Sequence, residues 1–213
     1  MIKIAYCNVD NLDLKRAYPL VSDNRKKKIS RFRFDKDKKL SCGAYLLLKK
    51  LLAEENITDA LFKTGEYGKA YITNYPDIHF NISHSVKYVA CGISDTQIGV
   101  DIEYNDSEID LNIAKYYFYN QEYTSIMNSK NPSDEFFKYW VLKESYMKYT
   151  GMGFHIALDS FEIEIKDQIK KIGDDKLNFS LFDVDDYKLA IASNYKVKNY
   201  FKYNVDALIS NEK

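Results

Sequence analysis

Two short motifs carry the side chains best suited to chemistry in this chain. The first, Gly99-Val100-Asp101-Ile102-Glu103, places two carboxylates two residues apart. Because side chains alternate between the faces of a strand, Asp101 and Glu103 would project together while Ile102 turns to the core. Mg²⁺ binds one or two such carboxylates together with phosphate oxygens and water. The motif therefore predicts a magnesium site; a polar strand end that runs into the next loop is the alternative.

The second motif lies about forty residues later and reads Trp140-Val141-Leu142-Lys143-Glu144-Ser145-Tyr146-Met147-Lys148. Trp140, Glu144 and Lys148 are four residues apart and would share one face of a helix. Lys143 lies about 100° around that helix from Glu144 and is expected to face elsewhere. Next to the first motif, this face would complete a site for a divalent cation and a phosphate ester. The alternative is an amphipathic helix with an ordinary Glu–Lys pair.

A third motif, Phe80-Asn81-Ile82-Ser83-His84-Ser85, ends a probable strand in a polar turn. Ser83 and His84 have donors that suit a phosphate. A hydrolase would also require that the two groups meet, with an orienting acid and an oxyanion hole. The sequence contains no Gly-x-Ser-x-Gly, so we reject nucleophilic catalysis. A capped turn without function is the alternative.

A strongly basic segment spans residues 25–39, with nine Lys or Arg against Asp35 and Asp37. It is either a solvated helix or loop, or an electrostatic clamp for a polyanionic ligand. Nucleic acid is a weaker interpretation, because the formal net charge of the whole chain is zero. Further on, Glu66-Tyr67-Gly68-Lys69 forms a glycine turn that presents a lysine.

Length and composition set the remaining limits. The 213 residues, 46% of them hydrophobic, suffice for one large domain or two small ones and argue against disorder. No apolar run approaches the roughly 20 residues that span a bilayer. Three cysteines and three histidines are scattered, which argues against a disulfide framework and a structural zinc site. A strand pattern starts at once, leaving no room for a signal peptide, so we expect a cytoplasmic protein.

The pattern of elements predicts an α+β fold. Strands and a helix come first, then helices, then strands again, unlike the strict alternation of a doubly wound sheet. We expect each half to be a helix on a small antiparallel sheet, with a boundary near residues 104–107. The expected helices cover 40–52 and most of 108–150, and the expected strands cover 2–6, 78–82, 88–93, 98–102, 161–165, 177–182, 188–192 and 200–205.

Taken together, these motifs and Phe118-Tyr119-Asn120-Gln121-Glu122-Tyr123 resemble the 4'-phosphopantetheinyl transferases, in that family's order and spacing. The resemblance is to the larger monomeric type, which activates surfactin synthetase and related assembly lines. It covers nearly the whole chain, from about residue 2 to about residue 205. It implies two similar α+β halves related by a pseudo-twofold, residues 1–104 and 105–213, with the active site in the cleft between them.

The resemblance also implies an activity. The family transfers 4'-phosphopantetheine from coenzyme A to a serine of an apo peptidyl or acyl carrier protein, with Mg²⁺, and releases 3',5'-ADP. Coenzyme A and a carrier protein are the expected partners, without nucleic acid or membrane. The small trimeric fatty-acid type is disfavoured by the length of this chain. A catalytically silent module that binds coenzyme A, a nucleotide or a carrier protein is the other alternative.

Site residues follow from the resemblance by position. Asp101, Glu103 and Glu144 match the magnesium ligands, Glu122 the general base, and Lys148 a catalytic contact to the coenzyme A phosphates. The positions that hold 3'-phosphoadenosine and pyrophosphate are Arg25, Lys28, Ser41, Lys69, Ser83 and His84. The family usually carries arginine just before the hydroxyl residue matched by Ser41, where this chain has Leu40.

Overall fold

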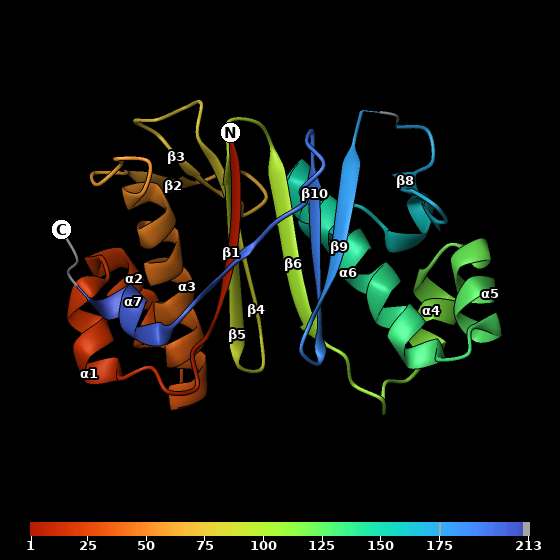
Figure 1. Cartoon of the computed structure of the whole chain (residues 1–213), viewed down its shortest axis with the longest axis horizontal. Coiled ribbons are helices and arrows are strands. Elements are labelled where there is room, and N and C mark those ends of the chain that lie inside the picture. Colours follow the sequence, from red (N-terminus) through yellow and green to blue (C-terminus); the bar gives the residue numbers. More distant parts are fainter. Residues whose placement is uncertain (175, 211–213) are drawn as a thin grey trace.

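Two sheets lie next to each other in the middle of the molecule (Figure 1). The computed structural model describes residues 1–174 and 176–210. The first sheet has the order β11-β1-β5-β4, from β1 (Ile2–Asn8), β4 (His79–Ser85), β5 (Tyr88–Ser94) and β11 (Phe201–Tyr203). The second has the order β6-β10-β9, from β6 (Ile98–Tyr104), β9 (Asn178–Val184) and β10 (Tyr187–Ser193).

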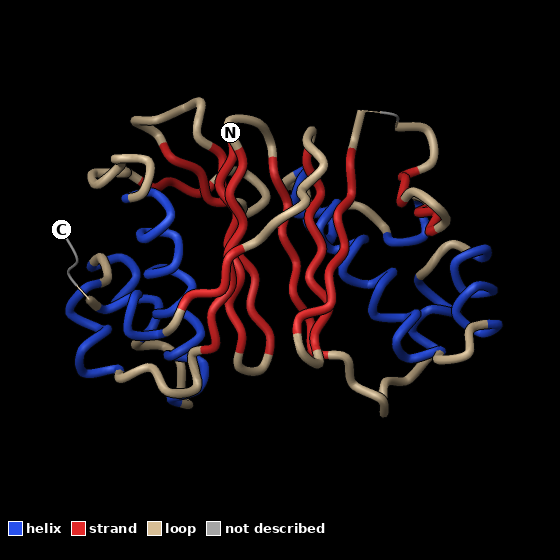
Figure 2. The backbone as a smooth tube through the Cα atoms, viewed as in Figure 1, coloured by secondary structure: helices blue, strands red, loops and turns tan. Residues whose placement is uncertain are grey.

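Helices occupy the two outer layers, as the tube in Figure 2 shows. Beside the first sheet lie α1 (Leu14–Ala17), η1 (Tyr18–Leu20), α2 (Asp23–Ile29), α3 (Asp35–Ala53) and α7 (Val205–Ile209). Beside the second lie α4 (Asn112–Tyr117), α5 (Asn120–Asn128), α6 (Pro132–Thr150), η2 (Gly153–His155) and η3 (Leu158–Ser160). Two small hairpins are β2 (Phe62–Thr64) with β3 (Ala70–Ile72), and β7 (Ile163–Ile165) with β8 (Ile169–Lys171). No helix in the described residues is long and apolar enough to cross a membrane.

Strand alternation divides the hydrophobic core into three layers. On β1, Ala5 faces the helical layer that contains α3, whereas Ile4 faces the space between the sheets. On β10, Leu189 also faces that space, whereas Ala190 faces α6. Because side chains alternate along a strand, each central strand can contribute to two layers. Both sheets are therefore covered on both faces, which explains why the central strands β5 and β10 are buried along their whole length.

The two halves of the chain repeat one order of elements. In the first, β1 is followed by α3, the β2–β3 hairpin, β4 and β5; in the second, β6 is followed by α6, the β7–β8 hairpin, β9 and β10. In both sheets the first strand of the set pairs with the last, giving β1-β5-β4 and β6-β10-β9. The long helices α3 and α6 each have 19 residues. This arrangement confirms an α+β fold of two similar halves.

The chain crosses between the two sheets more than once. Strand β6, which the sequence interpretation places in the N-terminal half, pairs with β10 in the second sheet. After β10 the chain returns, so that β11 pairs in parallel with β1. Helix α7 follows and contributes Leu208 and Ile209 to the same core as α3. The division into residues 1–104 and 105–213 stays a prediction.

Most expected elements are present with shifted ends. The helix expected over 40–52 begins earlier, at Asp35, so the basic segment 25–39 comprises α2, a loop and the first turn of α3. The turn-rich segment around Gly65 and Gly68 is the β2–β3 hairpin. The strand expected over 200–205 is short, because α7 begins at Val205.

Local sequence signals define both ends of α6. The side chain of Asn131 accepts a hydrogen bond from the Asp134 N–H, and Pro132 occupies the first turn. These are favourable residues at a helix start, because the first N–H groups lack partners within the helix. The helix ends at Gly151, whose φ of 77° lies in the left-handed region that favours glycine. The orientation of α6 matters because it carries the second motif.

Side chains rather than backbone pairs join the two sheets at their adjacent edges. Asn81 on β4 accepts a hydrogen bond from the Val100 N–H on β6 at 2.8 Å. Two residues further along β4, the Ser83 hydroxyl donates to Asp101 at 2.8 Å. Alternate side chains of β4 therefore take the place of a regular ladder at this seam. We use "the seam" for this contact between β4 and β6.

Gly99 allows α6 to approach β6 closely. A Cβ atom at residue 99 would lie 1.9 Å from the Ser145 carbonyl oxygen and 2.4 Å from the Tyr149 nitrogen. Both neighbours are backbone atoms of the helix and cannot move aside alone. The glycine of the first motif therefore sets the distance between β6 and α6, and with it the distance between the two motifs.

We expect Gly99→Ala to lower the free energy of unfolding by about 2–4 kcal/mol, because overpacking at backbone atoms forces the helix to shift. Urea denaturation would measure it. The matched control is Gly65→Ala, where a Cβ would meet only the Lys69 carbonyl oxygen at 3.4 Å. Equal stability of the two variants would contradict the close approach described here.

Candidate active site at the seam

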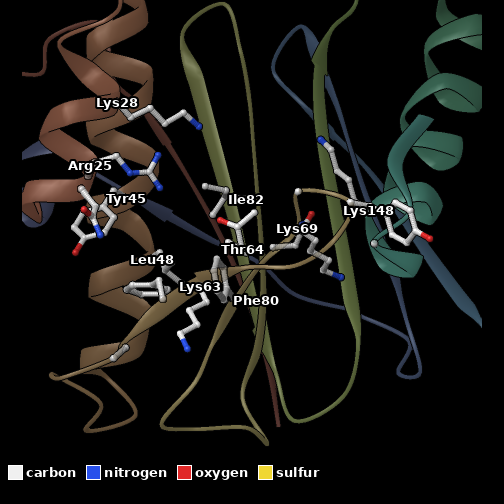
Figure 3. A pocket seen from close by; sticks show the side chains of 18 of the residues that line it. Arg25, Lys28, Tyr45, Leu48, Lys63, Thr64, Lys69, Phe80, Ile82 and Lys148 are labelled. Carbon is white, nitrogen blue, oxygen red and sulfur yellow. The ribbon is translucent and has the colours of Figure 1, made fainter. Parts of the chain in front are cut away.

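Two adjoining cavities open beside the seam. The larger has a volume of about 700 Å³ and the smaller about 450 Å³, and both are lined by Arg25, Lys28, Ile82 and Lys148. Figure 3 shows Arg25 and Lys28 entering the larger cavity from one side and Lys148 from the other. Phe80 and Ile82 of β4 lie between them. The cavities are thus one continuous region with basic groups on both sides.

The smaller cavity, which we call the acidic recess, brings the two sequence motifs together. Asp101 and Glu103 of β6 line it with Glu144 and Lys148 of α6. Trp140 lines it too, so the predicted shared face of α6 is confirmed. Its remaining lining residues are Arg25, Lys28, Phe32, Ser41, Ala44, Ile82, Ser83, His84 and Phe154.

Asp101 is the central side chain of the acidic recess. It is 1% exposed, and its Oδ1 accepts hydrogen bonds from Lys148 Nζ at 2.6 Å and from the Ser83 hydroxyl at 2.8 Å. Its Oδ2 has no hydrogen-bond partner in the described structure, although it is buried. A buried carboxylate oxygen without a partner is costly and calls for an explanation. A bound cation would supply the missing partner.

The pKa values of the other two carboxyls in the recess are raised. Burial raises the pKa of Glu103 to about 7, with further contributions from the charges of Asp101 and Glu144. The hydrogen bond from Ser85, at 2.6 Å, opposes this rise in pKa. Burial, followed by the charge of Asp101, also raises the pKa of Glu144. Carboxylates that repel one another in this way are stabilised by a cation between them.

The recess fits a magnesium ion in its donor chemistry. Within residues 1–174 and 176–210, no three His, Cys, Asp or Glu side chains already stand together as a complete metal cage. Mg²⁺ does not need one, since it usually keeps several waters and binds one or two carboxylates with substrate phosphates. The unpartnered Oδ2 of Asp101 and the adjacent Glu103 and Glu144 are hard oxygen donors of the required kind.

Basic and hydroxyl groups face the acidic recess from α2 and α3. Arg25 Nη1 donates to the Ser41 hydroxyl at 3.5 Å, and the guanidinium lies 5.3 Å from the centre of the Tyr45 ring. Burial lowers the pKa of Arg25 and of Lys28, and the charge of Arg25 lowers the pKa of Lys28 further. Two like charges held close together in this way favour an anionic ligand.

His84 lines the acidic recess together with Arg25 and Lys28, and we call these three residues the basic wall. Burial lowers its pKa, and the charges of Lys148, Lys28 and Arg25 lower that pKa further. The imidazole is therefore neutral at pH 7 with one N–H donor, until a nearby anion offsets the surrounding positive charge.

Leu40, which stands where the family usually has arginine, is buried in the core that contains α3. It does not line either cavity. The guanidinium beside Ser41 belongs instead to Arg25, from the preceding helix. The hydroxyl of Ser41 therefore has a guanidinium beside it although residue 40 is leucine.

Lys69 lines the larger cavity, but its ammonium already has partners. Nζ donates to the carbonyl oxygens of Ile98 at 3.0 Å and Tyr149 at 3.1 Å, and to the Gln97 side chain at 3.3 Å. Burial lowers the pKa of Lys69 to about 8. In this arrangement Lys69 ties the β2–β3 hairpin to β6 and to the end of α6. A phosphate contact by Lys69 stays a prediction.

Glu122 is the predicted site residue that the structure brings into neither cavity. It lines neither cavity, is 1% exposed, and forms an ion pair with Lys143 at 2.9 Å. A general base must lie within hydrogen-bond reach of the proton that it takes. In this arrangement Glu122 does not meet that requirement, and its role as general base stays a prediction. Lys143 faces away from the recess, as its position around the helix predicts.

Asn81 and Ser85 contact β6 at the seam, although the sequence motif did not single them out. Both lie on the same side of β4 as Ser83, and Ser85 donates to Glu103 while accepting from the Tyr104 N–H. The signal was present, because residues two apart in a strand share a face. Phe154, at the mouth of the recess, gave no such signal, since it follows a turn whose path the sequence does not specify.

Comparison with known proteins decides the family. A family model described as 4'-phosphopantetheinyl transferase, N-terminal, matches residues 9–95, and one described as the 4'-phosphopantetheinyl transferase superfamily matches residues 97–192. This chain belongs to the 4'-phosphopantetheinyl transferase family. It is therefore an enzyme, a transferase, and the resemblance drawn from the sequence motifs is confirmed. The two matched regions correspond to the two similar halves of the fold.

Curated relatives agree with this assignment. The 4'-phosphopantetheinyl transferase gsp of Aneurinibacillus migulanus is 37% identical over 176 residues, which cover 77% of this chain and 72% of the relative. The 4'-phosphopantetheinyl transferase Sfp of Bacillus subtilis is 33% identical, covering 71% of this chain and 69% of the relative. The L-aminoadipate-semialdehyde dehydrogenase-phosphopantetheinyl transferase of Xenopus laevis is 31% identical, covering 72% and 57%.

The raised pKa of Glu103 predicts a pH-dependent stability difference. Because the folded-state pKa exceeds its ordinary value of 4.5, the stabilising contribution of this carboxyl is complete below pH 4.5 and is lost as pH rises through about 7. Glu103→Gln removes that loss. Without added divalent metal, the free energy of unfolding of the variant relative to wild type should rise by on the order of 1 kcal/mol between pH 4.5 and about 8.

Urea denaturation at several pH values would measure this difference. The control is Asp167→Asn, in the exposed turn between β7 and β8, whose difference from wild type should not grow over the same range. If the difference in unfolding free energy between Glu103→Gln and wild type stays constant with pH, the raised pKa of Glu103 is contradicted.

Proposed function

We propose that this enzyme transfers the 4'-phosphopantetheine group of coenzyme A to a serine of an apo peptidyl or acyl carrier protein, using Mg²⁺ and releasing 3',5'-ADP. The observation that carries the proposal is the buried Asp101 with its unpartnered Oδ2, facing a basic wall across the acidic recess. A phosphate ester and a divalent cation together satisfy both sides. Family membership then supplies the group that is transferred.

Each side of the recess would do a separate part of the work. Asp101, Glu103 and Glu144 would hold Mg²⁺, which when bound neutralises pyrophosphate charge and stabilises the charge that develops on the leaving group. Lys148 places a second cation next to Asp101, at 2.6 Å. Phosphoryl transfer depends more on positioning and charge neutralisation than on covalent chemistry by the protein. The site offers both.

The larger cavity would take the nucleotide end of coenzyme A. Its volume of about 700 Å³ lies within the usual range for small-molecule sites, and Tyr45, Leu48 and Phe80 give it apolar walls. Arg25 and Lys28, on the boundary between the cavities, would bind phosphate groups, and a guanidinium can do so with two parallel hydrogen bonds. Ser41, Ser83 and His84 would add neutral donors from the recess.

The serine of the carrier protein would enter the recess and release its proton there. Glu103 and Glu144 lie in the recess, where a carboxylate can accept this proton directly or through a water molecule. The attacking oxygen bonds to the phosphorus atom of the pantetheine phosphate, and the bond to the 3',5'-ADP oxygen breaks. The serine proton passes to a recess carboxylate.

The alternative, a silent module that binds coenzyme A or a carrier protein, predicts binding without transfer. The acidic recess disfavours it, because simple nucleotide binding does not require three carboxylates opposite the basic wall. A monomeric state and a cytoplasmic location stay predictions, as does the absence of nucleic acid and membrane partners.

The experiment that tests the proposal is intact mass spectrometry of an apo peptidyl carrier domain incubated with this enzyme, coenzyme A and Mg²⁺. We expect the carrier to gain one phosphopantetheine group, and EDTA to prevent the gain. Coenzyme A binding without any gain, across peptidyl and acyl carriers, would contradict the proposal and favour the silent module.

Removal of a recess carboxylate should abolish transfer. For Asp101→Ala or Glu144→Ala we expect turnover to fall at least about a hundredfold, because charge stabilisation in a preorganised site is lost. Circular dichroism should show a retained fold, and Asp167→Ala, in an exposed turn, is the control. Near-normal turnover of either variant at ordinary Mg²⁺ concentration would contradict the metal assignment.

Arg25→Ala should act on coenzyme A affinity. We expect KM for coenzyme A to rise by about tenfold or more, because a charge-assisted contact is lost, while KM for the carrier protein changes little. The control is Arg16→Ala on α1, an exposed arginine that lines neither cavity. Unchanged coenzyme A affinity would contradict the proposed phosphate contact of Arg25. Arg25 would then not replace the arginine that the family usually carries where this chain has Leu40.

A further inference from the structure

Lys143 is a fully buried cation next to the active site. It is 0% exposed, although it directly precedes Glu144 of the acidic recess. Its Nζ contacts Glu122 at 2.9 Å and donates to the carbonyl oxygens of Leu158 at 2.7 Å and Phe161 at 2.8 Å. An ammonium has three donors, and all three are used here.

Glu122 completes the network from the other side. Its Oε2 accepts from the Tyr119 N–H at 3.0 Å, and its Oε1 accepts from the Ile163 N–H at 2.7 Å. The ring of Phe161 lies 4.2 Å from Lys143 Nζ and encloses the pair. The charges are therefore paired and hydrogen-bonded, which is the condition under which a buried ion pair is tolerated.

The pair connects three parts of the chain that surround the recess. Glu122 lies in the first turn of α5, and Lys143 lies in the middle of α6. Lys143 donates to the carbonyl oxygens of Leu158 and Phe161, and Glu122 accepts from the Ile163 N–H. These main-chain groups belong to residues 158–163, at the end of the segment that folds back after α6. That segment begins at residue 151 and carries Phe154, which lines the acidic recess, and Gly153, which lines the larger cavity.

We propose that Glu122 and Lys143 are a positioning pair, which fixes the rotation of α6 and the return of residues 151–163 and thereby places Glu144, Lys148 and Phe154 for transfer. The inference rests on the proposed function for its kinetic consequences but not for its structural ones. It replaces a base at Glu122 with a role that acts through neighbouring residues. No covalent step is involved.

The network favours positioning over base catalysis at Glu122. Its carboxylate already receives donors from Lys143, Tyr119 and Ile163, and its side chain is 1% exposed. A serine from another protein would have to displace α5 or residues 158–163 to reach it. Positioning needs no such movement.

Three variants separate positioning from base catalysis: Glu122→Gln, Lys143→Met, and the double variant. Each single change leaves one buried charge without its partner, which is strongly destabilising, whereas removing both charges is often tolerated. We expect each single variant to lose at least about tenfold in kcat and the double variant to return to within about threefold of wild type, as coupled neighbours behave. The pH dependence of kcat should keep its wild-type shape in all three.

Two kinetic outcomes would overturn the proposal. If Glu122 is the base, Glu122→Gln loses turnover, the ascending limb of the pH profile changes, and the double variant is not rescued. If the pair only stabilises the fold, folded single variants lose unfolding free energy but keep wild-type kcat and KM. The control pair is Glu164→Gln with Lys166→Met, an exposed ion pair that should change none of these quantities.

Hydrogen–deuterium exchange tests the pair without any assay of activity, so failure of the proposed function and failure of this inference are distinguishable. In Lys143→Met we expect faster exchange in residues 151–163 and in the first turn of α5, with wild-type exchange in the central strands β1, β5 and β10. In Lys166→Met we expect wild-type exchange throughout. Unchanged exchange of residues 151–163 in both Lys143→Met and Glu122→Gln would overturn the proposal.

Discussion

The buried carboxylate of Asp101 connects the two halves of the molecule. It lies on β6 of the second sheet, yet it accepts hydrogen bonds from Ser83 on β4 of the first sheet and from Lys148 on α6. A buried charge is stable only when such partners are supplied. The contacts that hold the halves together at the seam are therefore the same contacts that shape the acidic recess. Asp101 therefore contributes both to the packing of the two halves and to the chemistry of the recess.

Close packing keeps that arrangement in place. Gly99 lets α6 lie against β6, and the capped ends of α6 set where the helix starts and stops. The buried pair of Glu122 and Lys143 then restrains α6 from its opposite side. Protein interiors are densely packed, so a shift of one element displaces its neighbours. The helix that carries half of the site is therefore held on two faces.

Charge separation across the site explains how a neutral chain can bind a polyanion. Three carboxylates gather on β6 and α6, where Lys148 pairs with Asp101, and the basic groups of α2 face them across a recess of about 450 Å³. Local fields of this kind act over a few ångströms, where solvent screening is weak. The zero net charge of the whole chain does not describe these local fields.

The sequence alone determined a large part of this result. Alternation of polar and apolar residues specified the strands and the shared face of Asp101 and Glu103, and four-residue spacing specified the shared face of Trp140, Glu144 and Lys148. These predictions succeeded because the period of a strand or a helix is a local property. The motifs in order also identified the family, and the order of the expected elements made an α+β fold the expected outcome.

Only the tertiary structure decided which of those side chains meet. It brought Arg25 beside Ser41 and buried Leu40 in the core, gave Lys69 main-chain partners, and buried Glu122 against Lys143 rather than in the recess. It also placed β6 in the second sheet and returned the C-terminal strand to the first. The physical reason is that burial and long-range contacts depend on how distant segments pack. Periodicity in the sequence orients a side chain on its own element but does not say what lies opposite.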